Sequence, residues 1–373
     1  MNLESAIHRL TQLFEQTAMP SLPGNDVPVV VYGGGDCGRD VLHVLREAGY
    51  NVAAFLDANA AKICRIENVP CYLPEGPEAR RLAAGQMPVV IAVFNYATDT
   101  GAIENSLRHY GFKNILPYYA AAATLPNLKS RFWFRPRKFL EQHIDDIRRG
   151  LELWADDKSR EIYLQLVELR LTGNLQLLRQ PDRAHQYFPE DLPPLREPVR
   201  LIDGGAFTGD TLAALGRFHL EAVAAFEPDL ENFRALRHWL KNNGAGITEA
   251  VLFPCGLDSK TAMRRFKTGQ GEGSAVMSTG DVTIPVVALD DVLPHFAPTF
   301  IKFDIEGAEM SALMGATEMI KKNQPRIAVC LYHKPADLWE IPLLMQQIAP
   351  KQQLFLRYHA FNGLEIVAYA FEP

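Results

Sequence analysis

Cysteine is scarce in this chain, and the cysteines present are not spaced as a metal-binding or redox pair. There are five, an odd number, and no C-x-x-C motif occurs among them. This argues against a zinc site or a disulfide framework, and it favours free thiols in a reducing compartment. The five are Cys37, Cys64, Cys71, Cys255 and Cys330.

Long apolar runs are also missing. The longest ones have the length of a strand, whereas a membrane-spanning helix needs about 20 apolar residues. Residues 1–5 do not begin a signal peptide, because no basic segment precedes a long apolar run. We therefore expect a soluble cytoplasmic protein with no membrane partner.

An excess of positive charge is absent as well. Lysine and arginine number 38 against 44 acidic residues, which gives a net charge of −6. We therefore expect no nucleic-acid partner. Residues 131–137 are locally basic and aromatic, and we interpret them as a linker whose aromatic rings pack while the arginines stay solvated. A length of 373 residues is long for one core, so two domains are expected.

A glycine-rich turn follows the first predicted strand. Residues 1–24 are expected to form an amino-terminal helix that ends at prolines. The β-branched run 27–32 then leads into Gly33–Gly38, a G-x-G-x-x-G motif, and Asp57 ends the next strand 19 residues after Gly38. This layout is typical of a dinucleotide site in which Gly33, Gly35, Gly38 and Asp57 contact the ligand. The same glycines would equally allow close packing of helix and strand.

Residues 25–120 are thus predicted to be a Rossmann-like domain of nucleotide-binding type. The domain resembles the amino-terminal domain of hexapeptide sugar O-acyltransferases. The resemblance rests on Gly33–Gly38, Phe55-Leu56-Asp57, Asn68-Val69-Pro70 and Val90–Val93. It implies a sugar nucleotide as a ligand of this domain. Residues 121–198 are expected to form a helical connector that covers the edge or mouth of the second domain.

A second glycine turn organises the carboxy-terminal half. Residues 201–211 pass from a buried strand through three glycines into a helix, and the strand 222–226 ends in Glu227-Pro228. Strand, glycine turn, helix, strand and terminal acid is the layout of a doubly wound sheet that binds an adenosine-like ligand. Glu227 is placed to accept hydrogen bonds from both ribose hydroxyls, because a carboxylate offers two acceptor oxygens.

Later strands carry acids and a histidine to the same edge of the sheet. Residues 299–304 form a strand that ends at Asp304, with Glu306 just beyond, and residues 326–333 form another that ends at His333. Lys302 lies within its strand and needs a partner, for which Glu306 and Glu309 are candidates. Residues 264–285 are predicted to form an inserted hairpin or lid with Gly269, Gly271, Gly273 and Ser274.

The last two strands are expected to add an antiparallel strand at the edge of the parallel sheet. Residues 354–358 and 366–371 are apolar and flank Asn362-Gly363, which predicts an antiparallel hairpin. The fold class is therefore α/β, with two doubly wound Rossmann-like domains. The second, residues 199–373, has a seven-stranded sheet with one antiparallel edge strand, the architecture of S-adenosylmethionine (SAM) methyltransferases.

Residues 155–373 resemble the FkbM family of SAM-dependent methyltransferases. The resemblance rests on segments 202–211, 225–228, 287–291 and 301–309, and also on Leu313, Gly315-Ala316, 332–334, 337–339 and 356–359. It implies SAM as the cofactor and a hydroxyl of a sugar, glycan or polyketide-like metabolite as the methyl acceptor. The implied cofactor residues are Asp203, Gly204, Gly205, Ala206, Phe207, Gly209, Asp210, Thr211, Glu227, Pro228 and Asp304.

An alcohol is a poor nucleophile, so a positioned base would help methyl transfer. His333, Asp304 and Glu306 are the catalytic candidates, and His333 is the first choice for the base because its ordinary pKa lies near neutrality. We expect no metal, although the Asp304 and Glu306 pair could instead hold a divalent cation. The acceptor pocket is expected near residues 264–285, the loop after His333 and Tyr187.

Other functions remain open at this point. An NAD(P)-dependent oxidoreductase or a nucleotide-sugar-binding protein would use the amino-terminal glycine turn, and a non-catalytic binding module would use neither turn for chemistry. A homo-oligomer is compatible with the sequence, which carries no signal of oligomeric state.

Overall fold

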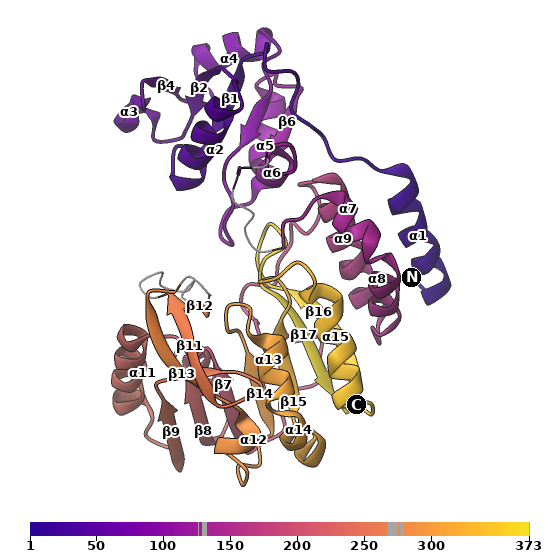
Figure 1. The fold of residues 1–373 in the computed structure, drawn as a ribbon, viewed down its shortest axis with the longest axis vertical. Helices are drawn as coiled ribbons and strands as arrows, with labels where there is room; N and C mark the ends of the chain where they lie inside the picture. The colour runs from indigo at the N-terminus through magenta and orange to yellow at the C-terminus, as the bar shows by residue number, and fades with distance from the viewer. Residues whose placement is uncertain (126, 129–132, 268–274, 277–279, 373) are drawn as a thin grey trace. The chain divides into compact units, whose positions relative to one another are not determined.

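The computed structural model describes residues 1–125, 127–128, 133–267, 275–276 and 280–372 (Figure 1). The chain divides into two compact units, and each is discontinuous in sequence. Unit 1 comprises Met1–Asp145, Arg160–Arg183 and Tyr358–Glu365, and unit 2 comprises Asp146–Ser159, Ala184–Arg357 and Ile366–Pro373. Residues 121–198, expected to be one connector, are therefore shared between both units.

Unit 1 is built on a mostly parallel sheet. Its strands are β1 (Val29–Tyr32), β2 (Val52–Leu56), β3 (Arg65–Ile66), β4 (Val69–Tyr72), β5 (Val89–Ile91) and β6 (Ile115–Pro117). Their order is β3-β4-β2-β1-β5-β6, and neighbouring strands are parallel except for β3 with β4. Strand β1 lies between β2 and β5, so the glycine turn that follows β1 lies at the point where the strand order reverses.

The amino-terminal helix of unit 1 is present, as the sequence predicts. Helix α1 is capped by the side chain of Asn2, which accepts a hydrogen bond from the backbone of Ser5, and it ends at Gln16, within the predicted range 1–24. The helices are α1 (Leu3–Gln16), α2 (Asp36–Glu47), α3 (Ala60–Ile63), α4 (Pro77–Ala84), α5 (Thr100–His109), α6 (Tyr118–Thr124) and α7 (Arg137–Gln142). Two further helices, α8 (Ile144–Glu152) and α9 (Asp157–Thr172), each contribute residues to both units.

Unit 2 contains the sheet that positions the candidate site. Its strands are β7 (Val199–Gly204), β8 (Leu220–Phe226), β9 (Glu249–Phe253), β14 (Phe300–Phe303), β15 (Arg326–Cys330), β16 (Gln353–Tyr358) and β17 (Ile366–Phe371). The order is β16-β17-β15-β14-β7-β8-β9. The pairs from β15 to β9 are all parallel, and β17 runs antiparallel to β15.

Two details of the predicted sheet are wrong. The reversed strand, β17, is not at the edge, because β16 lies outside it. The final strand is thus inserted between its predecessor and β15. In addition, β15 ends at Cys330, so His333 belongs to the loop that follows and not to the strand. The mixed α/β fold class itself is confirmed.

A second, smaller sheet follows β9. It consists of β10 (Gly256–Leu257), β11 (Ala262–Lys267), β12 (Ala275–Val276) and β13 (Val282–Val287), in the order β10-β13-β11-β12. Strands β11 and β13 pair antiparallel, so the hairpin predicted within residues 264–285 is present. Gly269, Gly271, Gly273 and Ser274, which the prediction placed in it, lie outside the described residues.

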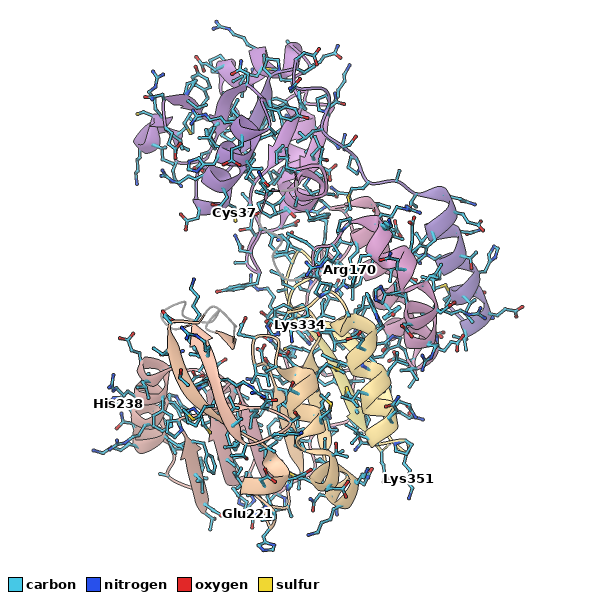
Figure 2. The ribbon with its side chains drawn as sticks, in the orientation of Figure 1. Cys37, Arg170, Glu221, His238, Lys334 and Lys351 are labelled. Atoms are coloured by element: carbon cyan, nitrogen blue, oxygen red, sulfur yellow. The ribbon has the colours of Figure 1, made fainter. Side chains whose placement is uncertain are left out.

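The helices of unit 2 complete its layers (Figure 1). They are α10 (Asp210–Ala214), the 3-10 helix η1 (Leu215–Arg217), α11 (Leu230–Asn243), α12 (Leu289–Val292), α13 (Glu309–Met314), α14 (Thr317–Asn323) and α15 (Asp337–Ile348). Figure 2 shows Glu221, near the amino-terminal end of β8, and Lys334, beyond the carboxyl end of β15, at opposite ends of the strands of this sheet. In the described ranges, no helix combines the length and apolarity needed to cross a membrane.

Candidate functional site

The turn after β7 is shaped by positive backbone angles. Gly205 has φ of 76°, Phe207 of 44° and Gly209 of 98°. A Cβ on Gly205 would lie 1.9 Å from the carbonyl oxygen of Asp304, so glycine is required there. Gly205 and Ala206 both donate their N–H groups to the carbonyl of Phe226. The turn is therefore fixed against the ends of β8 and β14.

Glu227 lies immediately after β8 and is 6% exposed. Its Oε2 accepts a hydrogen bond from the N–H of Phe207 at 2.9 Å, and its Oε1 accepts one from the N–H of Asp229 at 2.8 Å. Burial raises the pKa of Glu227 to about 7, although these two backbone hydrogen bonds act in the opposite direction. Each oxygen keeps a further lone pair, so the carboxylate can still accept hydrogen bonds from a ligand.

Asp203 and Lys302 form a buried ion pair across two neighbouring strands. The register places Lys302 of β14 beside Asp203 of β7, and Nζ lies 3.2 Å from Oδ1. Nζ also donates to the carbonyl of Gly205 at 2.6 Å. The prediction that Glu306 or Glu309 partners Lys302 is wrong, because the sheet register brings Asp203 to it.

Burial sets the charge state of this pair. It raises the pKa of Asp203 to about 6, and Lys302 opposes that rise. Burial alone would lower the pKa of Lys302, but Asp203, Asp304 and Asp210 outweigh it and raise that pKa. Among the described residues, Oδ2 of Asp203 and the hydroxyl of Thr211 have no hydrogen-bond partner although both are buried. Such orphaned polar atoms are expected where a ligand completes the hydrogen bonding.

The remaining predicted ligand residues surround this turn. Gly204 ends β7, and a Cβ there would come within 2.8 Å of Leu257 and Phe303. Asp210 is exposed at the start of α10. That helix has five residues, so its contribution as a dipole is small. Pro228 is half-buried between Glu227 and Asp229.

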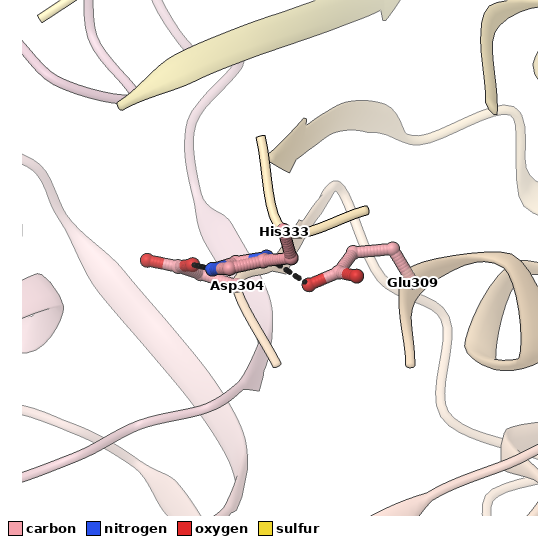
Figure 3. Close-up of side chains that lie close together, drawn as sticks. All are labelled: Asp304, Glu309 and His333. Carbon is pink, nitrogen blue, oxygen red and sulfur yellow. Dashed lines mark hydrogen bonds and ion pairs between the residues drawn. The ribbon is translucent and has the colours of Figure 1, made fainter. Parts of the chain in front are cut away.

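The three catalytic candidates lie close together beyond β14. His333 Nε2 lies 3.5 Å from Oδ1 of Asp304 and 3.6 Å from Oε1 of Glu306. On the other side of the ring, Nδ1 lies 2.9 Å from Oε1 of Glu309. Figure 3 shows the imidazole between the carboxylates of Asp304 and Glu309. The histidine side chain is 3% exposed, whereas Asp304 and Glu306 are 21% and 24% exposed, so the acids reach solvent and the ring does not.

Glu309 holds the loop that carries this cluster. Its Oε1 accepts hydrogen bonds from the N–H groups of Ile305 and Gly307 at 2.8 and 3.4 Å. Glu306 and Gly307 have φ of 53° and 95°, so the chain needs such external support there. Glu309 was predicted from the sequence only as a candidate partner of Lys302, and this role was not predicted. The signal in the sequence was a carboxylate four residues after Ile305, close enough along the chain to accept a hydrogen bond from its N–H.

Tyrosines add further contacts to Asp304. The hydroxyl of Tyr187 donates to Oδ2 at 2.8 Å, and that of Tyr332 donates to Oδ1 at 3.4 Å. Nζ of Lys302 lies 5.4 Å from the centre of the Tyr187 ring. Sequence analysis placed Tyr187 near the acceptor pocket but did not connect it with Asp304.

The carboxylates and the histidine perturb one another. Burial would raise the pKa of Asp304, but Lys302, His333 and the Tyr187 hydroxyl outweigh it, and the pKa is lowered. The pKa of Glu306 is raised, chiefly by burial. Burial would lower the pKa of His333, yet Glu309 and Glu306 raise it well above its usual value. His333 thus holds a proton at neutral pH when only these side chains surround it.

The amino-terminal glycine turn has its own acid. Asp57 follows β2, and its Oδ2 and Oδ1 accept hydrogen bonds from the N–H groups of Gly34 and Asn59, each at 2.7 Å. A Cβ on Gly38 would lie 2.0 Å from the carbonyl oxygen of Gly33, whereas one on Gly35 would meet nothing within 4 Å. Close packing therefore explains Gly38, while Gly35 borders open space.

A cavity of about 550 Å³ also lies in unit 1. Pro88, Lys113 and Asn114 line it at the amino-terminal ends of β5 and β6. Ligands of doubly wound sheets bind at the opposite, carboxyl edge. None of the residues predicted to bind a nucleotide lines this cavity.

Comparison with known proteins finds a family similarity in the carboxy-terminal half of the chain. Residues 203–361 match the family model described as the methyltransferase FkbM domain. The match begins at Asp203 and includes Glu227, Asp304 and His333. Residues 203–361 are thus similar to FkbM methyltransferase domains, in agreement with the resemblance found in the sequence.

A solved structure of similar fold covers nearly the whole chain. The chain is 21% identical to the methyltransferase FkbM from Methylobacillus flagellatus KT, with 99% of each chain covered and a TM-score of 0.76. An rRNA methylase from Streptococcus thermophilus is 14% identical over 48% of this chain and 89% of that chain, with a TM-score of 0.30. Fibrillarin from Aeropyrum pernix, in complex with S-adenosyl-L-methionine, is 11% identical over 50% and 72%, with a TM-score of 0.30. No curated protein matches the chain.

Proposed function

We propose that this protein is a SAM-dependent O-methyltransferase that acts on a hydroxyl of a sugar, glycan or polyketide-like metabolite. The observation that carries the proposal is the buried carboxylate of Glu227, which is held at the end of β8 by the N–H groups of Phe207 and Asp229. A carboxylate so fixed is suited to accept hydrogen bonds from two adjacent ribose hydroxyls.

The residues around the turn fit the rest of the cofactor. Oδ2 of Asp203 lacks a hydrogen-bond partner among the described residues, and it can receive the ligand ammonium directly or through water. Gly204 and Gly205 leave the backbone bare for close approach. When bound, SAM supplies a methyl group on a positively charged sulfur. Gly209, Asp210, Thr211 and Pro228 border the same turn.

Proton removal from the acceptor falls to the cluster after β14. We assign the proton acceptor to Glu306 in place of His333, because His333 holds its own proton at neutral pH. Burial raises the pKa of Glu306 above its ordinary value, which strengthens this carboxylate as a general base. Asp304 stays ionised and hydrogen-bonded to Tyr187, so it can orient the hydroxyl that reacts. Alignment of this kind supplies much of the rate of a displacement reaction.

Calorimetric titration with SAM tests the cofactor assignment. Wild type is expected to bind, and Glu227→Ala to bind about ten- to a hundredfold more weakly, because hydrogen bonds to a charged group are lost. Glu231→Ala is the matched control, because Glu231 is exposed on α11 nearby. Absence of SAM binding by folded wild type, or unchanged affinity in Glu227→Ala, would refute the proposal. Mass spectrometry of methylated hydroxyl compounds then identifies the acceptor class.

A second candidate function concerns unit 1. Asp57 accepts the N–H of Gly34, just as Glu227 accepts the N–H of Phe207, so both glycine turns are tied to an acid at the end of the next strand. We propose that the Gly33–Gly38 turn binds a nucleotide, either a sugar nucleotide or NAD(P). Titration with UDP-sugars and NADH tests this, with Asp57→Ala expected to abolish binding. Asp26→Ala, at an exposed position, is the control, and wild type without heat or fluorescence change would rule the site out.

A further inference from the structure

We propose that Asp304, Glu306 and His333 bind one divalent transition-metal cation at the acceptor side of the site. The proposal replaces the sequence-based expectation of a metal-free site, and it rests on the proposed function for its chemical purpose. It stands on the geometry of the donor atoms, on an unpartnered buried nitrogen and on the balance of charge.

The histidine presents the correct atom. Oε1 of Glu309 already accepts hydrogen bonds from two backbone N–H groups, so it is an acceptor, and Nδ1 of His333 is the atom that carries hydrogen in their 2.9 Å contact. Nε2 is thereby directed toward Asp304 and Glu306. A carboxylate that orients the far side of a histidine ring is the usual support of a metal ligand.

The distances around Nε2 suit a shared cation better than hydrogen bonds. Nε2 is buried and makes no hydrogen bond to any described residue, because 3.5 Å to Asp304 and 3.6 Å to Glu306 are too long for good ones. Two ligands bound at about 2.1 Å with tetrahedral angles lie about 3.4 Å from each other.

Charge favours an added cation. Three carboxylates, those of Asp304, Glu306 and Glu309, surround one imidazole. The nearby ammonium of Lys302 is held by Asp203 and by the carbonyl of Gly205. Even with a protonated ring, the cluster is short of positive charge, which a divalent ion would supply.

The donor set indicates which metals fit. Magnesium and calcium prefer oxygen ligands alone, whereas an imidazole nitrogen with two carboxylates suits manganese, iron or zinc. A cation here would supply the positive charge that binds an acceptor hydroxyl and lowers its pKa. Glu306 keeps a second oxygen through which it can still accept a proton.

Electron paramagnetic resonance with Mn²⁺ tests the site on the full-length, chelator-treated chain. One bound Mn²⁺ per chain is expected, with zinc displacing it and magnesium displacing it far less effectively. Pulsed measurement of the wild-type complex should show coupling to a histidine nitrogen, and this result requires no variant to fold. His333→Gln and Glu306→Gln should each weaken Mn²⁺ binding at least tenfold, and Glu309→Gln ten- to a hundredfold. His295→Gln, at an exposed position, should bind as wild type does.

Several results would overturn the proposal. These are no bound Mn²⁺ in wild type, no nitrogen coupling, magnesium competing as well as zinc, or unchanged affinity in folded His333→Gln and Glu306→Gln. Calorimetry with SAM on the same samples separates the two proposals. If wild type binds SAM but does not bind Mn²⁺, the cation site alone is refuted. If wild type binds Mn²⁺ but does not bind SAM, the proposed function is refuted.

Discussion

The backbone N–H of Phe207 donates a 2.9 Å hydrogen bond to the carboxylate of Glu227. This bond ties the glycine turn after β7 to the end of β8, so the two features that the sequence places 20 residues apart form one cradle. Phe207 adopts φ of 44° to present that N–H, a backbone angle that is uncommon for a side chain of its size. The cradle is therefore built by both segments together.

The pKa of Glu227 predicts a pH dependence of cofactor binding. Burial raises this pKa from 4.5 to about 7, and the protonated acid loses acceptor capacity. The dissociation constant for SAM should therefore rise as pH falls below about 7, approaching tenfold per pH unit. Calorimetry between pH 5.5 and 8.5 measures it. Glu227→Gln, which does not titrate, should show a flat profile over that range, and a wild-type profile equally flat would contradict the prediction.

The same shift has a consequence for stability. The folded chain binds more protons than the unfolded chain between pH 4.5 and about 7, so the free energy of unfolding should decrease as pH rises through that window. Urea denaturation of wild type and Glu227→Gln at several pH values checks the sign. The difference in the free energy of unfolding between wild type and Glu227→Gln should change with pH in that window and be constant above it.

Replacing Gly205 with alanine should destabilise unit 2. The added Cβ would lie 1.9 Å from the carbonyl oxygen of Asp304, at a backbone φ of 76°. We expect a loss of about 3 kcal/mol in the free energy of unfolding. Gly216→Ala is the control, because a Cβ there meets nothing within 4 Å. Equal denaturation midpoints for the two variants would show that the turn relaxes freely.

The buried ion pair predicts strong coupling between two strands. Lys302→Met leaves Asp203, which is fully buried, without its cation, and should cost about 3–5 kcal/mol. The double variant Lys302→Met with Asp203→Asn removes the stranded charge and should recover much of that loss. Chemical denaturation of the single and double variants forms the cycle. Additive effects of the two changes would show that the pair is not coupled.

Tyr187 should affect methyl transfer without affecting cofactor binding. Tyr187→Phe removes the 2.8 Å hydrogen bond to Asp304, and a bond to a charged group of about 1.5 kcal/mol corresponds to roughly tenfold in kcat. The dissociation constant for SAM should stay unchanged. Tyr332→Phe removes a longer, 3.4 Å contact to the same carboxylate and should reduce kcat less. A larger loss in Tyr332→Phe would reverse this ranking.

Much of the local structure could be predicted from the sequence. The β-branched runs before Gly33 and Gly204 predict buried strands, and the glycines and the following polar residues predict turns into helices, because these signals act between near neighbours. The acids Asp57, Glu227 and Asp304 could be placed at strand ends for the same reason. The antiparallel direction of the final strand, β17, was predicted. Its position between β16 and β15 was not predicted, because the order of strands in a sheet is not encoded locally.

What the sequence by itself determined is the main strands of the two larger sheets and the acids that follow β2, β8 and β14, because residue spacing and glycine content control both. Only the tertiary structure decided which of these side chains contact one another. Asp203, and not a neighbouring acid, faces Lys302, because the register of β7 against β14 sets that contact. His333 lies among three carboxylates of residues 304–309, and Tyr187 reaches Asp304 from a segment 117 residues away. Those distances depend on how the strands pack, and packing joins residues that the chain keeps apart.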